Sequence, residues 1–207
     1  MLAGVQVGAL RLDDPTAAKR NISRFILHPD YYNSQADPDA ASPRLVNDIA
    51  LVLLDAPVEG VPLQQLADNS TEVEPGQTLL AAGWGKVPGA TATSPDPNTV
   101  LTTELSAVGL EECQEWFTAF NQSQLAGADD LCAGSAAANS TCSGDSGGPL
   151  LLPGGVQVGI TSHGLFGEAA GPGGPGACGA TGHLTAFASV AHFRPWIDSV
   201  LAEEGLL

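Results

Sequence analysis

The residues best suited to chemistry lie in one stretch, 142–150, which reads Cys-Ser-Gly-Asp-Ser-Gly-Gly-Pro-Leu. Glycines on both sides of Ser146 let the backbone turn sharply and leave room for a substrate carbonyl beside the hydroxyl. The backbone N–H groups of Gly144 and Ser146 could then point at a developing oxyanion. The stretch is therefore a candidate nucleophile turn for acyl transfer.

Two other interpretations of this stretch have to be weighed. It could be a tight Gly/Ser turn with no chemical role. The pattern Gly144-x-Ser146-x-Gly148 also fits the nucleophile elbow of α/β-hydrolases, which needs a strand before the serine and a helix after it. Residues 147–149, Gly-Gly-Pro, are a poor helix start, and residues 150–160 alternate like a strand. The elbow is therefore disfavoured.

Residues 144–150, Gly-Asp-Ser-Gly-Gly-Pro-Leu, resemble the nucleophile motif of the chymotrypsin/trypsin-like serine proteases. Other matches follow in the family's order: Asn-Asp-Ile-Ala-Leu at 47–51, Gly-Trp-Gly at 83–85 and Pro-Trp-Ile at 195–197. The resemblance implies that Ser146 is the nucleophile and Asp48 the triad acid. The plainer alternative for Asp48 is a cap or turn aspartate.

The fold that the resemblance implies is all-β, with two six-stranded antiparallel β-barrels of the trypsin-like type, the first incomplete, a short intermediate helix and a C-terminal helix. The expected units are the remnant of the amino-terminal barrel at 1–56, an interdomain crossing segment at 57–77, and the carboxy-terminal barrel with its helix at 78–207. The 25 glycines and 15 prolines independently favour many short strands.

Local patterns predict the individual elements. Strands are expected at 2–12, 23–27, 47–54 and 100–108, with a polar turn at 11–20 and loops at 33–44, 87–98 and 165–177. The resemblance implies two further strands, at 79–85 and 156–164. Apolar residues at helical spacing predict a helix over 110–120. The last helix can start after Ser189 and end at Gly205.

The charge balance limits the possible partners. Lys and Arg number 7 against 23 Asp and Glu, for a formal net charge of −16. This argues against nucleic acid or an anionic membrane as a partner, and it fits either basic substrates or a solvated acidic surface. No stretch is expected to span a membrane, and we expect a monomer that acts on protein or peptide substrates.

The four cysteines form no Cys-x-x-Cys pair, so two disulfides in an oxidising compartment are expected rather than a metal site. The resemblance implies the pairs Cys113–Cys132 and Cys142–Cys178. No cofactor is implied, and no carboxylates have the spacing of a calcium loop. An extracellular protein is further indicated by Asn-x-Ser/Thr sequons, although no signal peptide is recognised in residues 1–10. The sequons begin at Asn21, Asn69, Asn121 and Asn139.

The base of the expected triad is missing. The family's order is His, Asp, Ser, with the histidine in a Thr-Ala-Ala-His-Cys segment. Only His28 precedes Asp48, and it matches the family's non-catalytic His-Pro-x-Tyr turn. His163, His183 and His192 follow the serine and match a cleft wall, a strand and the start of the last helix. The chain is therefore interpreted as truncated at the amino terminus, and a rearranged triad that uses His163 stays an alternative.

A second consequence concerns Asp145. The resemblance implies that this carboxylate pairs with a buried terminal amine on activation. Without that amine, we expect it to lie unpaired at a cost of several kcal/mol or to swing out and leave the oxyanion hole unformed. The chain as given should then hydrolyse peptides poorly or not at all.

The resemblance also suggests the specificity. Ser140 stands where trypsin-like members carry an aspartate, and the cleft and pocket are expected to be lined by Ser140, Ser162, His163, Gly164 and Gly182. A neutral, open pocket favours apolar or aromatic side chains. The predicted function is a serine endopeptidase that works through an acyl-enzyme; the alternative is an inactive homologue that serves as a binding or regulatory module. The intact nucleophile turn favours the enzyme.

Overall fold

The computed structural model describes residues 4–33, 45–87, 97–119, 129–137, 139–164 and 178–206. The amino-terminal part contains β1 (Gly4–Val7), β2 (Ala18–Leu27), β3 (Tyr32–Asn33), β4 (Leu45–Val46) and β5 (Ala50–Leu54). The remainder contains β6 (Thr78–Gly83), β7 (Leu101–Val108), α1 (Leu110–Ala119), β8 (Asp130–Gly134), β9 (Pro149–Leu151), β10 (Gln157–Gly164), β11 (Leu184–Ser189) and α2 (Val190–Glu203).

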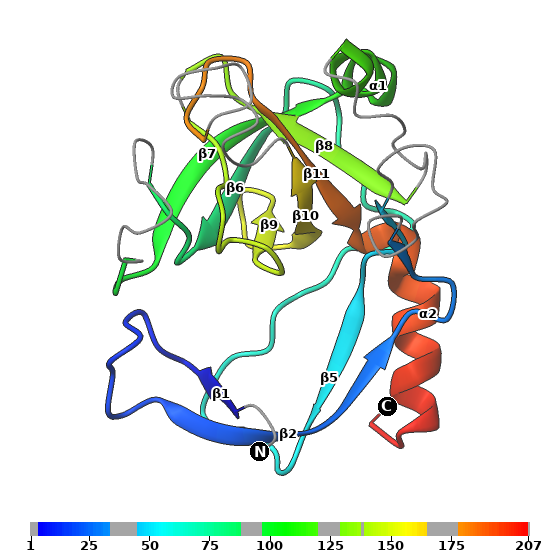
Figure 1. Ribbon diagram of the computed structural model, residues 1–207. Coiled ribbons are helices and arrows are strands. Elements are labelled where there is room, and N and C mark those ends of the chain that lie inside the picture. Colours follow the sequence, from blue (N-terminus) through cyan, green and yellow to red (C-terminus); the bar gives the residue numbers. More distant parts are fainter. Residues whose placement is uncertain are drawn as a thin grey trace.

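The carboxy-terminal strands form a closed antiparallel barrel with the order β10-β11-β8-β7-β6-β9 (Figure 1). Its interior is filled by small and branched side chains, since alternate residues of each strand point inward. The main core cluster contains Ala67, Leu79, Ala81, Leu105, Ala107, Ala133, Leu150, Val158, Phe187 and Val190. The predicted six-stranded second barrel is confirmed.

The amino-terminal part is an open sheet in the described residues. Its strand order is β1-β2-β5, and β3 pairs separately with β4. One face of β2 and β5 leaves apolar side chains in solvent: Phe25, Leu27 and Val52 are 52%, 56% and 42% exposed. The described residues therefore form one closed barrel, an open three-stranded sheet and the separate β3-β4 pair, which agrees with the predicted incomplete first barrel.

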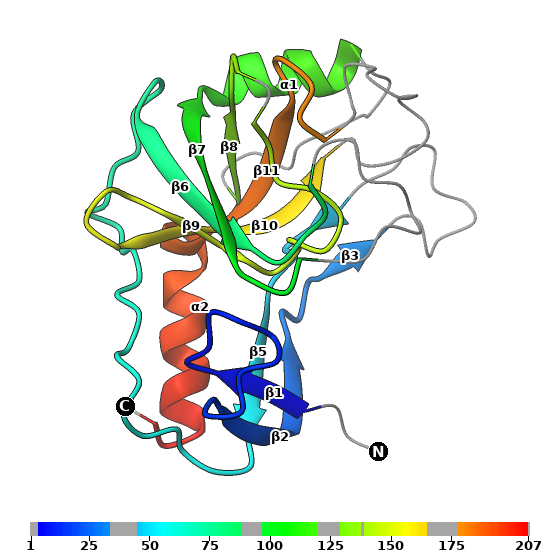
Figure 2. The same ribbon diagram turned by 90° about the vertical axis from the view of Figure 1, so that its left-hand side faces the viewer.

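Helix α2 runs alongside β2 and β5 below the closed barrel (Figures 1 and 2). Its N-cap is Ser189, whose hydroxyl accepts a hydrogen bond from the His192 N–H, as predicted for a helix that starts there. Phe193 and Ile197 are buried in a cluster with Ile49, which precedes β5. Because α2 packs on both parts, it fixes the position of the segment that carries Asp48.

Several predicted boundaries are wrong. Strand β1 is limited to Gly4–Val7, and β2 begins at Ala18, inside the predicted polar turn at 11–20. Residues 18–21 of β2 pair with β1, while its later residues pair with β5, so pairing on two edges extends the strand into polar sequence. Strands β3 and β4 were not predicted.

The predicted crossing segment at 57–77 is packed against the second barrel around Leu66 and again near its end, where the Gly76 N–H donates to the Ala107 carbonyl at 2.8 Å. Leu66 forms a parallel bridge with Gln157, and Ala67 is 1% exposed in the barrel core. The predicted loop at 165–177 and the end of the helix predicted over 110–120 lie outside the described residues.

Candidate active site

The turn that carries Ser146 lies between β8 and β9 and exposes the serine. The Asp145 N–H donates to the Cys142 carbonyl at 3.0 Å, and the Gly148 N–H donates to the Asp145 carbonyl at 2.9 Å. Gly144 and Gly147 have φ of 99° and 83°, values that side-chain-bearing residues rarely adopt. The glycines around the serine are therefore required by the backbone path.

Two backbone donors of this turn have no acceptor within the described part of the chain. The N–H groups of Asp145, Gly147 and Gly148 all donate to carbonyls, whereas those of Gly144 and Ser146 donate to none of the described residues. Unengaged N–H groups beside a hydroxyl are the elements of an oxyanion-binding site. These are the two donors that the sequence predicted for that role.

Asp48 lies just before β5 and is half-buried beside strand β10. The Ser162 hydroxyl donates to Asp48 Oδ2 at 2.6 Å and lies 3.0 Å from His163 Nδ1. Since the hydroxyl has one proton and gives it to the carboxylate, Nδ1 of His163 is the donor in the second contact, which leaves Nε2 as an acceptor. The fold thus joins three of the predicted site residues in one chain of hydrogen bonds.

Opposing effects act on the His163 imidazole. Burial lowers its pKa, and the carboxylates of Asp48 and Asp129 partly offset this by favouring the charged form. The ring also meets Phe117 of α1 edge-on, with centroids 5.6 Å apart. The net direction is downward, so the neutral form of His163 is favoured.

The other histidines lie in structural positions. His28 packs against Phe193 and Trp196 of α2, and His192 is exposed on that helix. His183 is fully buried against Trp116, and burial lowers its pKa to about 4. Among the described residues no histidine is hydrogen-bonded to Ser146.

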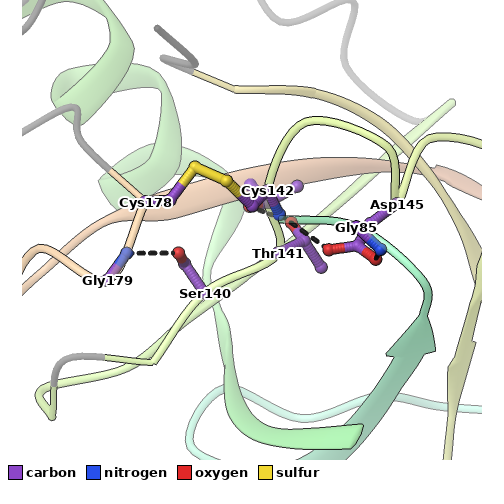
Figure 3. Close-up of a disulfide and its surroundings, with 8 residues drawn as sticks. Gly85, Ser140, Thr141, Cys142, Asp145, Cys178 and Gly179 are labelled. Atoms are coloured by element: carbon purple, nitrogen blue, oxygen red, sulfur yellow. Dashed lines mark hydrogen bonds between the residues drawn. A yellow bond between two sulfur atoms is a disulfide. The ribbon is translucent and has the colours of Figure 1, made fainter. Parts of the chain in front are cut away.

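The Asp145 carboxylate is neither unpaired nor turned outward, so that expectation is wrong (Figure 3). Its Oδ1 accepts from the Gly85 N–H at 2.7 Å, and its Oδ2 accepts from the Cys142 N–H at 2.8 Å. Two backbone donors hold the carboxylate inward, because charge-assisted hydrogen bonds offset part of its desolvation. A cavity of about 180 Å³ adjoins it, lined in part by Gly83, Leu101 and Ser140.

The two segments that flank the predicted pocket, 140–142 and 178–179, are joined by uncharged contacts. The disulfide Cys142–Cys178 joins them, and the Gly179 N–H donates to the Ser140 hydroxyl at 2.7 Å (Figure 3). A second disulfide, Cys113–Cys132, fixes α1 to β8. Two other residues on the predicted pocket wall, His163 and Gly164, pair with β11, and Gly182 has a φ of 74°. These pocket residues have no carboxylate in their side chains, so none of them places a negative charge beside Ser140.

Sequence reasoning missed three contributors to this site. Gly85 holds the Asp145 carboxylate, Ser162 links Asp48 to His163 rather than only lining the cleft, and Asp129 acts on His163 from the position directly before β8. No local pattern marks these roles, since each depends on segments brought together by the fold.

The described residues include no group of three or more His, Cys, Asp or Glu that could hold a metal ion. Within the same part of the chain, no helix is long and apolar enough to cross a membrane.

Known proteins resemble this chain over most of its length. A family model described as Trypsin matches residues 3–197. Kallikrein-1 of Mus musculus is 33% identical over 196 residues, which cover 92% of this chain and 68% of that protein. Renal glandular kallikrein of Mastomys natalensis is 32% identical over 196 residues, with the same two coverages. The chain thus spans about two thirds of the length of these relatives.

A solved structure, described as neuropsin, a serine protease expressed in the limbic system of mouse brain, superposes with a TM-score of 0.72. It is 27% identical in sequence, and the superposition covers 96% of this chain and 78% of that one.

Proposed function

Because this chain belongs to the trypsin family of serine proteases, we propose that it is the part of a serine endopeptidase that carries Ser146 as nucleophile and Asp48 as triad acid. The observation that carries the proposal is the exposed serine whose turn presents two unengaged backbone N–H groups. The contact between Asp48 and the cleft strand through Ser162 supports the role of the acid.

In the proposed reaction, Ser146 Oγ attacks the carbonyl carbon of the scissile peptide bond while a base takes the hydroxyl proton. The carbonyl oxygen becomes an oxyanion that the N–H groups of Gly144 and Ser146 stabilise. The C–N bond then breaks, the amine leaves with the proton, and water releases the acid from Ser146. Asp48 would orient the base and stabilise its charged form.

We assign the base to a histidine beyond the four of this sequence. His28, His183 and His192 pack in structural positions, as described above. His163 is the internal alternative, since its Nδ1 is linked to Asp48 through Ser162. The inward Asp145 carboxylate and its adjacent cavity fit a role as the acceptor of a terminal ammonium group, which would replace or join its two backbone donors.

We further propose a preference for apolar or aromatic side chains at the cleaved bond. Ser140 is neutral, and its hydroxyl accepts a hydrogen bond from the Gly179 N–H, so this side chain offers no charge to Lys or Arg. The disulfides support an extracellular location. The acidic surface fits a monomer whose partners are protein substrates rather than nucleic acid or membrane.

The test compares the chain as given with a form that is extended at the amino terminus by a Thr-Ala-Ala-His-Cys-containing segment. Both are treated with a serine-directed fluorophosphonate and a peptide substrate with an aromatic residue before the scissile bond. We expect turnover only from the extended form, and a loss of roughly 10⁴-fold in kcat for its Asp48→Asn variant. Ser146→Ala should remove labelling altogether.

Two results would count against this assignment. Stoichiometric labelling and turnover by the chain as given would place the base within it and favour His163, which a His163→Gln variant would then test. Cleavage only after Lys or Arg would contradict the neutral pocket.

A second function, that of an inactive homologue acting as a binding module, is favoured by one observation. Within the described residues no histidine is hydrogen-bonded to Ser146. An extended form that binds peptides but neither reacts with the fluorophosphonate nor turns over would support it.

A further inference from the structure

One motif of the sequence is not used by the proposed chemistry: the sequon Asn69-Ser70-Thr71. We propose that Asn69 carries an N-linked oligosaccharide. This inference is independent of the proposed function, because it depends only on the sequon, its place in the fold and passage through the compartment in which the disulfides form.

The structure presents Asn69 on a surface turn. The Thr71 N–H donates to the Asp68 carbonyl at 2.9 Å, which makes Asn69 and Ser70 the two central residues of a β-turn. Asn69 is exposed, and within the described residues its side-chain amide makes no hydrogen bond. The Asp68 carboxylate holds the turn instead, by accepting from the Ser70 N–H at 2.9 Å. An acceptor asparagine on a surface loop is the arrangement that N-glycosylation needs.

The other described sequons are engaged by the fold. Asn21 lies within β2, which is paired on both sides, and its Nδ2 donates to Asp55 Oδ2 at 2.7 Å. In the sequon that starts at Asn139, Thr141 is 3% exposed, and its hydroxyl is 2.8 Å from that of Thr185. Asn139 also lines the cavity beside Asp145. Asn21 and Asn139 are exposed as well, but an oligosaccharide at Asn21 would compete with the bond to Asp55, and one at Asn139 would stand beside the cavity. One at Asn69 would extend into solvent from the surface turn.

The modification is a group transfer from a lipid-linked pyrophosphoryl oligosaccharide. The bond between the sugar C1 and the pyrophosphate oxygen breaks, and a bond between C1 and Asn69 Nδ2 forms. The amide nitrogen loses one proton, and the lipid pyrophosphate is the leaving group. One N–H remains on the side chain, so the turn held by Asp68 is not altered.

The position also separates the sugar from the proposed catalytic cleft. The segment before the turn is fixed at the start of β10, where the Ala67 N–H donates to the Gln157 carbonyl at 2.9 Å. The predicted cleft residues His163 and Gly164 lie at the other end of that strand. Six residues of extended strand separate Gln157 from His163 by roughly 20 Å. An oligosaccharide on Asn69 should therefore leave access to Ser146 unchanged.

The experiment expresses the whole chain behind a secretion leader in a eukaryotic host and maps its glycopeptides by mass spectrometry. The map is made before and after treatment with a peptide N-glycosidase, an amidase that hydrolyses the sugar-bearing side-chain amide and so converts the modified asparagine to aspartate. We expect sugar on the peptide that contains Asn69 and none on those that contain Asn21 or Asn139. Asn69→Gln should remove the carbohydrate at this turn, while the matched control Asn139→Gln should leave it in place.

An unmodified Asn69 in secreted, disulfide-bonded protein overturns the proposal, as does sugar found at Asn139 in its place. If the Asn69→Gln protein is not secreted, the peptide map of the unaltered chain still decides the matter. If the unaltered chain is not secreted either, it is translated in the presence of microsomes. The same peptide mapping then shows whether Asn69 has received sugar.

Discussion

Gly85→Ala should destabilise the nucleophile turn by displacing the Asp145 carboxylate. A Cβ at position 85 would lie 2.4 Å from Asp145 Cγ and 2.5 Å from each carboxylate oxygen, distances that real Cβ atoms do not adopt. The carboxylate is fixed by the N–H groups of Gly85 and Cys142, so it cannot move away from an added methyl group without losing at least one of these bonds. The substitution therefore tests whether this carboxylate holds the turn together.

The magnitude follows from those two bonds. Hydrogen bonds to a charged group contribute about 1.5–3 kcal/mol each. Loss of one, with partial relaxation of the other, gives an expected cost of about 2–4 kcal/mol in the free energy of unfolding. With a urea m-value of about 2 kcal/mol/M for a chain of this size, the denaturation midpoint should fall by about 1–2 M.

The assay is urea denaturation of the disulfide-bonded chain, followed by tryptophan fluorescence, with Gly109→Ala as the matched control. At Gly109 the nearest atom to an added Cβ is 3.8 Å away, an ordinary contact, so the same substitution should change the midpoint little. A double-mutant cycle isolates the cause: in an Asp145→Ala background, Gly85→Ala should cost little more than the control. Equal midpoints for Gly85→Ala and Gly109→Ala, or an equal cost of Gly85→Ala in both backgrounds, would refute the reasoning.

Three further predictions concern the pH dependence of stability and the contacts around the site. The folded-state pKa of His183 is about 4, below its ordinary 6.5. As the pH falls, the unfolded chain therefore binds the proton before the folded chain does. The contribution of the neutral His183 to the free energy of unfolding is complete above about pH 6.5, and about 3 kcal/mol is lost as the pH drops towards 4. His183→Leu should flatten this part of the midpoint-against-pH curve, and an unchanged slope would contradict the assignment. Ser162→Ala should cost about 1–2 kcal/mol in urea denaturation, because the half-buried Asp48 carboxylate loses its hydroxyl donor; no measurable cost would mean that water replaces the donor. Replacing both Cys113 and Cys132 by alanine opens a crosslink with a sequence separation of 19 and should cost about 3 kcal/mol, measured by the same assay against the oxidised parent.

Local sequence determined the features that depend on near neighbours. The nucleophile turn follows from the glycines beside Ser146, since only glycine readily takes the positive φ found at positions 144 and 147. The last helix is determined by Ser189 at its N-cap and by its apolar spacing. The six strands of the second barrel were expected because the family motifs occur in order along the chain, and this prediction is confirmed.

Tertiary structure decided what depends on segments far apart in the chain. Pairing with both β1 and β5 extended β2 into a polar stretch that by itself reads as a turn. The inward position of the Asp145 carboxylate was decided by the Gly85 N–H, 60 residues away. The link between Asp48 and Ser162 spans 114 residues. A hydrogen bond between distant residues depends on how the barrel closes, and no local propensity encodes that geometry. The sequence therefore identifies the serine and its turn, and the fold decides which groups hold the charges around it.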